Sequence, residues 1–211
     1  MSKNNNVTIG VLGFQGDIEE NVAATRQALD ELKIDGKIQL VRYAEDVEKI
    51  DALILPGGES TVQSSLAAIQ RSLPALKKRI AEGMPVLGTC AGMIMLSKRA
   101  FDHVVGETKQ KTIGNLDIVI ERNAFGRQND SFETDLKMDM LGKDAFRGVF
   151  IRAPAVSEVG KDVEVIARHA GKIVAVKQKN IIGTSFHPEL AGDARMHKQI
   201  VKMAVEFKRG K

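Results

Sequence analysis

The stretch that decides the fold reads Pro85-Val86-Leu87-Gly88-Thr89-Cys90-Ala91-Gly92-Met93-Ile94-Met95-Leu96, and in it a short apolar strand turns directly into a helix. The turn holds Cys90, the only cysteine of the chain. A helix N-terminus favours a thiolate, because its free N–H groups carry partial positive charge. Gly88 and Gly92 flank Cys90 as G-x-C-x-G, the cysteine counterpart of a serine nucleophile elbow, and we expect them to let a substrate carbonyl approach closely.

A second apolar strand, Ile181 to Ser185, runs into His187 and, two positions later, Glu189. A lone cysteine is more often a small core residue, and a lone histidine or glutamate is usually structural or solvated. Together these three are the parts of an activated-thiol triad. We expect Cys90 to attack, His187 to take and return the proton, and Glu189 to orient the imidazole.

The first half of the chain alternates strands with helices. Strands are predicted at Val7–Leu12, Ile38–Val41, Ala52–Leu55 and Val86–Thr89, and helices at Leu73–Ala81 and after Asp17, where Asp17 and Glu20 are expected to form a capping pair. This alternation predicts an α/β fold with a mostly parallel central sheet flanked by helices. Ligands then bind at the carboxyl ends of the strands, where Cys90 lies.

The second half changes character. Strands are predicted in quick succession at Leu116–Ile120, Phe150–Arg152, Val163–Arg168, Ile173–Gln178 and Ile181–Ser185, with antiparallel hairpins among them. Asp193 is expected to cap a final helix that carries Met196, Ile200, Met203 and Phe207 on one face. Phe101 to Gly114 is interpreted as a surface excursion. Residues 1–211 are expected to form a single domain, with residues 1–6 as a disordered tail.

Composition excludes several classes of protein. A chain of 211 residues with 43% hydrophobic residues can bury one sizeable core. The net charge is +4, but basic and acidic residues are interleaved and there is no tryptophan, so we expect no nucleic-acid partner. No apolar run approaches the roughly 18 residues that span a bilayer, and the run Val7 to Phe14 is too short for a signal peptide, so no membrane partner is expected. A single cysteine cannot form an internal disulfide, which favours the cytoplasm.

Two glycine-rich stretches call for an explanation. Pro56-Gly57-Gly58-Glu59-Ser60 ends a strand, and its N–H groups are candidates for an oxyanion hole; the alternative is a simple turn into a helix capped by Ser60 or Thr61. Gly10, Gly13 and Gly16 have the spacing G-x-x-G-x-x-G rather than G-x-G-x-x-G, which argues against a dinucleotide site.

Six segments occur in an order that resembles the glutaminase subunits of pyridoxal 5′-phosphate synthases, a branch of the class I (triad-type) glutamine amidotransferase family. They are Gly13-Phe14-Gln15-Gly16-Asp17, Leu55-Pro56-Gly57-Gly58-Glu59-Ser60-Thr61, Gly88-Thr89-Cys90-Ala91-Gly92, Glu121-Arg122-Asn123-Ala124-Phe125-Gly126-Arg127-Gln128, Phe150-Ile151-Arg152-Ala153-Pro154 and Ser185-Phe186-His187-Pro188-Glu189. The resemblance covers essentially the whole chain. The second and fourth segments are far more specific than the triad.

The resemblance implies a three-layer class I glutamine amidotransferase-like fold and a glutaminase. It implies that glutamine is bound by Gly58, Glu59, Ser60, Arg122, Ile151 and Arg152, and that amides of Gly58 and Ala91 form the oxyanion hole. It places Gln15 near the active site and the synthase interface. No metal or cofactor is implied.

The implied partners are L-glutamine and a synthase subunit, in a hetero-oligomer of twelve synthase and twelve glutaminase subunits. The synthase would combine the ammonia with a pentose 5-phosphate and glyceraldehyde 3-phosphate. One position departs from the family's pattern: many relatives carry histidine where this chain has Asn21, in a helix that the family uses for docking.

Three other functions fit parts of the pattern. A glutaminase of another synthase, such as the imidazole glycerol phosphate enzyme, would share the triad but not the segments around Arg122 and Arg152. A cysteine peptidase would need a groove for a peptide. A non-enzymatic subunit would not need an intact triad.

Overall fold

The computed structural model describes residues 6–102, 106–108, 110–125 and 131–210. Its helices are α1 (Ile18–Leu32), α2 (Ala44–Val47), α3 (Ser60–Ile69), α4 (Ser72–Ala81), α5 (Ala91–Leu96) and α6 (Arg195–Arg209), with 3-10 turns η1 (Asp139–Leu141) and η2 (Pro188–Leu190). Its strands are β1 (Val7–Leu12), β2 (Gly36–Val41), β3 (Ala52–Leu55), β4 (Val86–Thr89), β5 (Ser97–Asp102), β6 (Gly106–Glu107), β7 (Leu116–Glu121), β8 (Phe132–Leu136), β9 (Phe146–Phe150), β10 (Ala155–Val159), β11 (Glu164–His169), β12 (Lys172–Gln178) and β13 (Ile181–Thr184).

The main sheet of the described residues runs in the order β2-β1-β3-β4-β13-β12-β10-β7-β5-β6, and β11 pairs with β12. The strands from β2 to β13 are parallel, and β12, β10 and β7 continue the sheet with antiparallel pairings. Strands β8 and β9 form a separate antiparallel hairpin. This confirms the α/β fold with a mostly parallel sheet and antiparallel strands in the second half of the chain.

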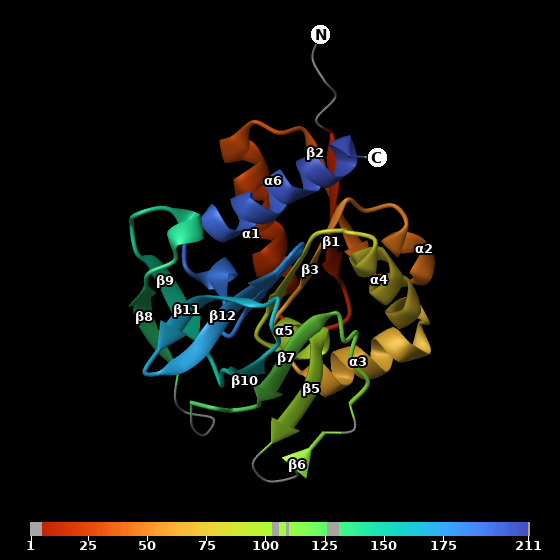
Figure 1. Cartoon of the computed structure of the whole chain (residues 1–211). Helices are drawn as coiled ribbons and strands as arrows, with labels where there is room; N and C mark the ends of the chain where they lie inside the picture. The colour runs from red at the N-terminus through yellow and green to blue at the C-terminus, as the bar shows by residue number, and fades with distance from the viewer. Residues whose placement is uncertain (1–5, 103–105, 109, 126–130, 211) are drawn as a thin grey trace.

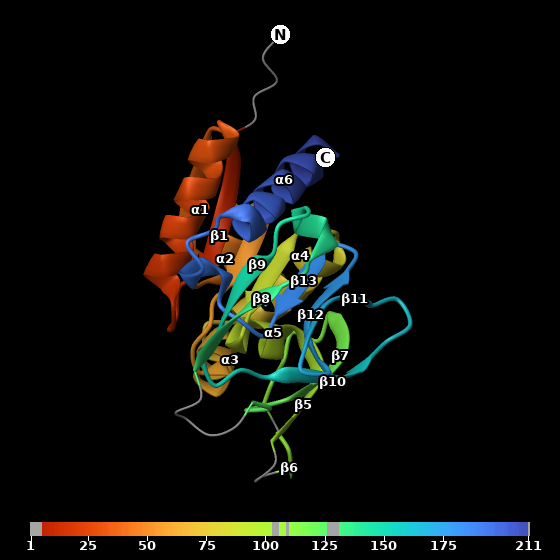
Figure 2. The same cartoon turned by 90° about the vertical axis from the view of Figure 1, so that its left-hand side faces the viewer.

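Helices cover the sheet on both faces, because successive side chains of a strand point to opposite sides. In β3, Ala52 and Ile54 belong to the core cluster that also contains residues of α1 and α6. Leu53 and Leu55 belong to the other cluster, with residues of α4 and α5. Helices α1 and α6 lie next to each other over one end of the sheet, and α2, α3 and α4 gather on the other side (Figures 1 and 2).

The predicted strands Val7–Leu12, Ala52–Leu55 and Val86–Thr89 are confirmed at both ends. The predicted strand Phe150–Arg152 is wrong: β9 ends at Phe150, and the chain then bends through Arg152, whose φ is 45°. An arginine in the left-handed region cannot continue a strand.

Other predictions need smaller corrections. The stretch Phe101–Gly114 is only in part an excursion, because it includes the end of β5, strand β6 and the buried Ile113. Asp193 does accept a hydrogen bond from the Arg195 N–H (2.9 Å), although the residue at the N-cap of α6 is Ala194. Residues 1–5 of the predicted tail, and Gly126, Arg127 and Gln128 of the fourth family segment, lie outside the described residues. Among the described helices, none is both long and apolar enough to cross a membrane.

Candidate active site

Cys90 occupies a strained turn between β4 and α5. Its backbone has φ 49° and ψ −105°, a combination that a residue with a side chain rarely adopts. The Cys90 N–H donates to the carbonyl of Thr184 over 2.8 Å, and the residue is 8% exposed. The predicted sharp turn from strand to helix is therefore present, with Cys90 at the carboxyl end of a parallel strand.

The glycines beside Cys90 are required by packing. A Cβ atom on Gly92 would lie 2.0 Å from the carbonyl oxygen of Leu55, and one on Gly88 would lie 2.8 Å from Gly92. Both contacts are inside the protein, so these residues are glycine because the start of α5 packs tightly against β3 and β4. The expectation that they let a substrate carbonyl approach closely stays a prediction.

The register of two strands brings His187 to the elbow. Strand β13 pairs in parallel with β4, with Thr184 opposite Thr89, so the chain leaves the sheet at Ser185 beside Cys90. The His187 N–H donates to the carbonyl of Val149 in β9 (2.8 Å), and the side chain is buried. Residues about a hundred positions apart in the sequence thus meet at one edge of the sheet.

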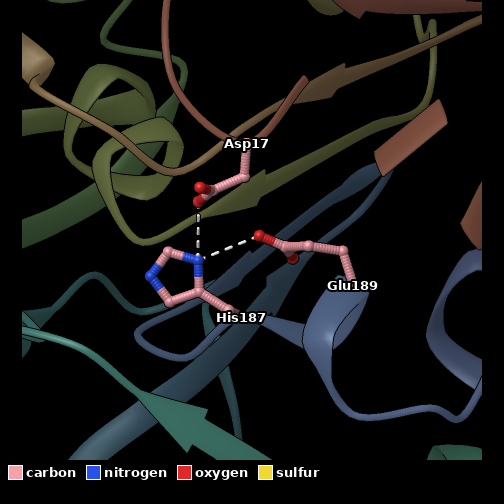
Figure 3. Close-up of side chains that lie close together, drawn as sticks. All are labelled: Asp17, His187 and Glu189. Carbon is pink, nitrogen blue, oxygen red and sulfur yellow. Dashed lines mark hydrogen bonds and ion pairs between the residues drawn. The ribbon is translucent and has the colours of Figure 1, made fainter. Parts of the chain in front are cut away.

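Two carboxylates face the same nitrogen of His187. Nδ1 lies 2.9 Å from Oε1 of Glu189 and 3.0 Å from Oδ2 of Asp17 (Figure 3). The Glu189 side chain is completely buried, whereas that of Asp17 is 33% exposed. Glu189 therefore lies where the orienting residue of the predicted triad belongs. Asp17 is a second partner that the sequence did not reveal as such.

Asp17 does not play the capping role that was predicted for it. It stands at the N-cap position of α1, but its side chain makes no capping hydrogen bond there. The carboxylate turns to His187 instead. The available signal was its place in the loop that joins β1 to α1, since the loops that follow parallel strands gather at the carboxyl edge of the sheet.

These contacts set the charge of His187. Burial of the imidazole acts to lower the pKa of His187, but hydrogen bonds with Asp17, Cys90 and Glu189 outweigh burial and raise it to about 12. In turn the hydrogen bond with His187 holds the pKa of Asp17 below its usual value, against partial burial, which acts to raise it. The site thus favours an imidazolium, the charge state that stabilises a neighbouring thiolate.

Asp17, His187 and Glu189 also place three ligand atoms within 4.8 Å of one another, as a metal site would. A metal ligand must be an unprotonated imidazole nitrogen, however, and the raised pKa of His187 favours the form in which both ring nitrogens carry a proton. The donor set therefore fits a proton shared among hydrogen-bonding groups better than a cation.

The loop of Gly57 and Gly58 lies against the histidine. A Cβ atom on Gly57 would lie 2.3 Å from Cε1 of His187, so only glycine permits this approach. The Gly57 carbonyl accepts hydrogen bonds from the Asp17 N–H (3.3 Å) and from Nε2 of Gln63 (3.2 Å). Since the carbonyl and the N–H of a trans peptide point in opposite directions, the Gly58 N–H points away from these two donors.

Charged side chains lie at the other end of the loop. Oε1 of Glu59 accepts from Arg122 (3.1 Å) and from the hydroxyl of Thr61 (2.7 Å), and the Glu59 N–H donates to Gln15 Oε1 (2.8 Å). Glu59 is thus the N-cap of α3, in place of the expected Ser60 or Thr61. Partial burial acts to raise the pKa of Glu59, but the Thr61 hydrogen bonds and the charges of Arg122 and Arg152 lower it on balance.

A cavity of about 140 Å³ gathers these groups. It is lined by Asp17, Gly58, Glu59, Ser60, Cys90, Ala91, Ile94, Arg122, Asn123, Ile151, Arg152 and His187. All predicted site residues except Glu189 are in this lining, and Glu189 contacts His187. Asp17, Ile94 and Asn123 are the lining residues that the sequence did not predict as site residues.

Cys90, Asn123 and Arg152 all have positive φ, and such backbone strain is frequent at functional sites.

Comparison with known proteins gives a consistent result. The model of the SNO glutamine amidotransferase family matches residues 11–206. A protein of Nitrosopumilus maritimus (strain SCM1) named pyridoxal 5′-phosphate synthase subunit PdxT is 46% identical over 200 residues, covering 95% of this chain and 98% of that protein. A protein of Archaeoglobus fulgidus with the same name is 49% identical over 195 residues, covering 92% and 97%.

Solved structures agree with this. A crystal structure described as that of a glutamine amidotransferase superposes with a TM-score of 0.79 at 42% identity, covering 93% of this chain and 98% of that one. The structure of PurLQS from Thermotoga maritima superposes with a TM-score of 0.66 at 16% identity, covering 98% and 100%, and supports the fold alone. These matches confirm the resemblance seen in the sequence.

Proposed function

The chain belongs to the SNO glutamine amidotransferase family, and from this premise we propose that it hydrolyses L-glutamine to L-glutamate and ammonia. The ammonia goes to a partner synthase subunit that makes pyridoxal 5′-phosphate, as the name of its relatives indicates. The observation that carries the proposal is one cavity that joins a strained cysteine, a histidine bound to carboxylates and a pair of arginines.

The cavity supports a single amino acid as the substrate. Arg122 and Arg152 line it together with Glu59, whose charge suits the α-ammonium group of glutamine. A guanidinium can hold the α-carboxylate through two parallel hydrogen bonds. The backbone carbonyl of Ile151, 4.0 Å from Sγ of Cys90, is a further acceptor near the reacting atoms.

In the first step the Cys90 thiolate attacks the side-chain amide carbon of glutamine. An S–C bond forms, and the negative charge moves to the amide oxygen. The backbone N–H groups of Gly58 and Ala91 are the donors that we propose for this oxyanion. His187 then gives its proton to the amide nitrogen, the C–N bond breaks, and ammonia leaves. A γ-glutamyl thioester remains on Cys90.

In the second step a water molecule attacks the thioester, and His187 takes its proton. Collapse of the tetrahedral intermediate breaks the C–S bond and releases glutamate, which restores the thiolate and the imidazolium. Nδ1 of His187 faces Glu189 throughout, which leaves the other ring nitrogen for these proton transfers. The chemistry needs no metal or redox cofactor, but the thiol must stay reduced, as it does in the cytoplasm.

The size of the cavity argues against a peptidase. A volume of about 140 Å³ is below the ~300–1,000 Å³ of pockets that hold drug-sized ligands, and a peptide needs a longer groove. The intact set of Cys90, His187 and Glu189 argues against a purely structural subunit. The assembly of twelve synthase and twelve glutaminase subunits stays a prediction that the mass of the complex in solution will test.

The test is to incubate the chain with glutamine, with and without a pyridoxal 5′-phosphate synthase subunit and its sugar phosphates. We expect glutamate in both cases and pyridoxal 5′-phosphate only in the complete mixture. A glutamine-analogue electrophile, 6-diazo-5-oxo-norleucine, should label Cys90, and Cys90→Ser should abolish both glutamate release and labelling. Glutamate release that survives in Cys90→Ser would contradict the proposal.

A further inference from the structure

Asp17 has contacts beyond those of a helix-capping residue. Its carboxylate lies 3.0 Å from Nδ1 of His187, and its N–H donates to the carbonyl of Gly57. Its carbonyl accepts from Nδ2 of Asn21 (2.7 Å) and from the Asn21 N–H (3.2 Å) in the first turn of α1. One residue therefore connects the base, the loop proposed to bind the oxyanion and the first helix.

We propose that Asp17 is a positioning residue for His187. Asp17 shares the Nδ1 proton of the imidazole with Glu189, and it ties the imidazole and the Gly57–Gly58 peptide to the start of α1. This inference rests on the proposed glutaminase function and adds a residue to it. Asp17 does not bond to the reacting atoms in this scheme; it acts through His187.

The geometry at Nδ1 supports a shared proton. A ring nitrogen carries at most one hydrogen, and the two carboxylate oxygens lie at nearly the same distance, 2.9 and 3.0 Å. Glu189 is completely buried and comes from η2, while Asp17 comes from the segment before α1 and meets the same ring nitrogen from another direction (Figure 3). Two anions from different parts of the chain thus meet at one nitrogen of the imidazolium.

The loop contact gives Asp17 a second effect. The Gly57 carbonyl has two donors, the Asp17 N–H and the Gln63 side chain. A shift of the first residues of α1 would therefore move the carboxylate at His187 and the peptide of Gly57 together. A partner that displaces this end of α1 would act on the base and on the loop at once.

The surrounding charges define what a pH experiment measures. The groups that face His187 are Asp17 before α1, Glu189 on η2 and Cys90 between β4 and α5. Glu59, Arg122 and Arg152 line the same cavity. Removal of Asp17 takes away a hydrogen bond that raises the pKa of His187, so the imidazolium beside Cys90 should be lost at lower pH on the alkaline side.

The experiment compares Asp17→Asn with Glu20→Gln in the full chain. Asparagine keeps the size of the side chain and is a good N-cap residue. Glu20→Gln removes one charge from the same turn of α1, at an exposed position away from the cavity, and serves as the matched control. Alkylation by iodoacetamide, followed by mass spectrometry against pH, reports on Cys90 alone because it is the only cysteine.

We expect Asp17→Asn to lower the alkaline midpoint of the alkylation profile, where His187 loses its proton beside the thiolate, by about one pH unit, the size of one charge-assisted hydrogen bond. We expect it to lower kcat/KM for glutamine roughly threefold to tenfold, through kcat more than KM. Glu20→Gln should match the parent. Alkylation and kinetic profiles of Asp17→Asn that coincide with those of Glu20→Gln would overturn the proposal.

A double variant separates a shared proton from a structural effect. If the two carboxylates can replace each other, Asp17→Asn with Glu189→Gln should lose more activity than the product of the two single losses. Purely multiplicative losses would contradict sharing. If Asp17→Asn unfolds, as circular dichroism would reveal, Asp17→Ser keeps an N-cap residue and takes its place in the comparison.

The alkylation readout also keeps the two hypotheses apart. If the parent fails to hydrolyse glutamine, the proposed function is wrong, but the pH profile of Cys90 still shows whether Asp17 acts on His187. If the parent is an active glutaminase and Asp17→Asn changes neither readout, only the role of Asp17 is wrong.

Discussion

The imidazole of His197 in α6 donates from Nε2 to Oδ1 of Asn21 in α1 over 3.2 Å, and both side chains are 0% exposed. The other ring nitrogen, Nδ1, has no hydrogen-bond partner among the described residues. The contact fastens α1 to α6 at the turn that follows Asp17. Asn21, the position where the sequence departs from many relatives, thus lies inside the molecule and cannot contact a synthase subunit directly.

The buried His197 should make the protein sensitive to acid. Burial lowers the pKa of His197 from 6.5 to about 4, so between these values the unfolded chain binds the proton and the folded protein does not. Stability from this group is complete above pH 6.5 and falls as the pH drops towards 4, by about 3 kcal/mol in all. The measurement is urea unfolding against pH for the parent and His197→Gln. A difference between them that does not vary with pH would contradict the assignment.

His187 should have the opposite dependence. Its pKa is raised to about 12, so the folded protein holds a proton that the unfolded chain loses above pH 6.5. The stability that His187 contributes is therefore complete below pH 6.5 and declines as the pH rises towards 12. We expect the stability of His187→Gln to fall less between pH 7 and 10 than that of the parent, measured by the same unfolding experiment. Parallel curves would mean that the imidazole is not held as the charged form.

The strained backbone at Cys90 predicts a trade between stability and activity. A residue with φ 49° and ψ −105° stores about 1–3 kcal/mol, and glycine relieves this at an entropic cost of about 0.5–1 kcal/mol. Cys90→Gly should therefore raise the free energy of unfolding by about 1 kcal/mol and abolish glutaminase activity. Cys90→Ala is the control, since it removes the thiol and keeps the strain. Equal stability of the two variants would mean that the turn relaxes at little cost.

The arginines should act on binding rather than on chemistry. Arg122 is held by Glu59 at 3.1 Å, and a lysine at either arginine position replaces a planar fork by a point charge. Arg122→Lys and Arg152→Lys should raise KM for glutamine about tenfold while kcat changes by less than about threefold. Steady-state kinetics will show whether this holds. Unchanged KM in both variants would remove the arginines from the substrate site.

The loop of Gly57 predicts dependence on a partner. The Gly57 carbonyl accepts from Asp17 and Gln63, so turning the Gly57–Gly58 peptide to reorient the Gly58 N–H breaks two hydrogen bonds. We expect the isolated chain to be a weak glutaminase and a matching synthase to raise glutamate release by about 10-fold or more, as the recovery of one oxyanion donor would do. Glutamate release titrated against synthase concentration tests this. Full activity without the partner would contradict the coupling.

The sequence by itself predicted the elements that depend on local patterns. Strands β1, β3 and β4 are short runs of mostly apolar residues, and a buried parallel strand requires such a run. Cys90 could be proposed because it stands directly after such a strand, and His187 and Glu189 because they follow the apolar run of β13 within a few residues. The fold class and the residues of the cavity followed from these local features and from the family resemblance.

Only the tertiary structure decided the contacts between distant segments. Asp17 has the sequence context of a helix cap, and its neighbours in the chain do not identify His187, 170 positions later, as its partner. The pairing of Thr89 with Thr184 sets the distance from Cys90 to His187, and Asn21 meets His197 because α1 and α6 pack on the same face of the sheet. Local patterns express the conformational preferences of neighbouring residues, whereas the partners of a polar side chain depend on which segments the packed core brings together.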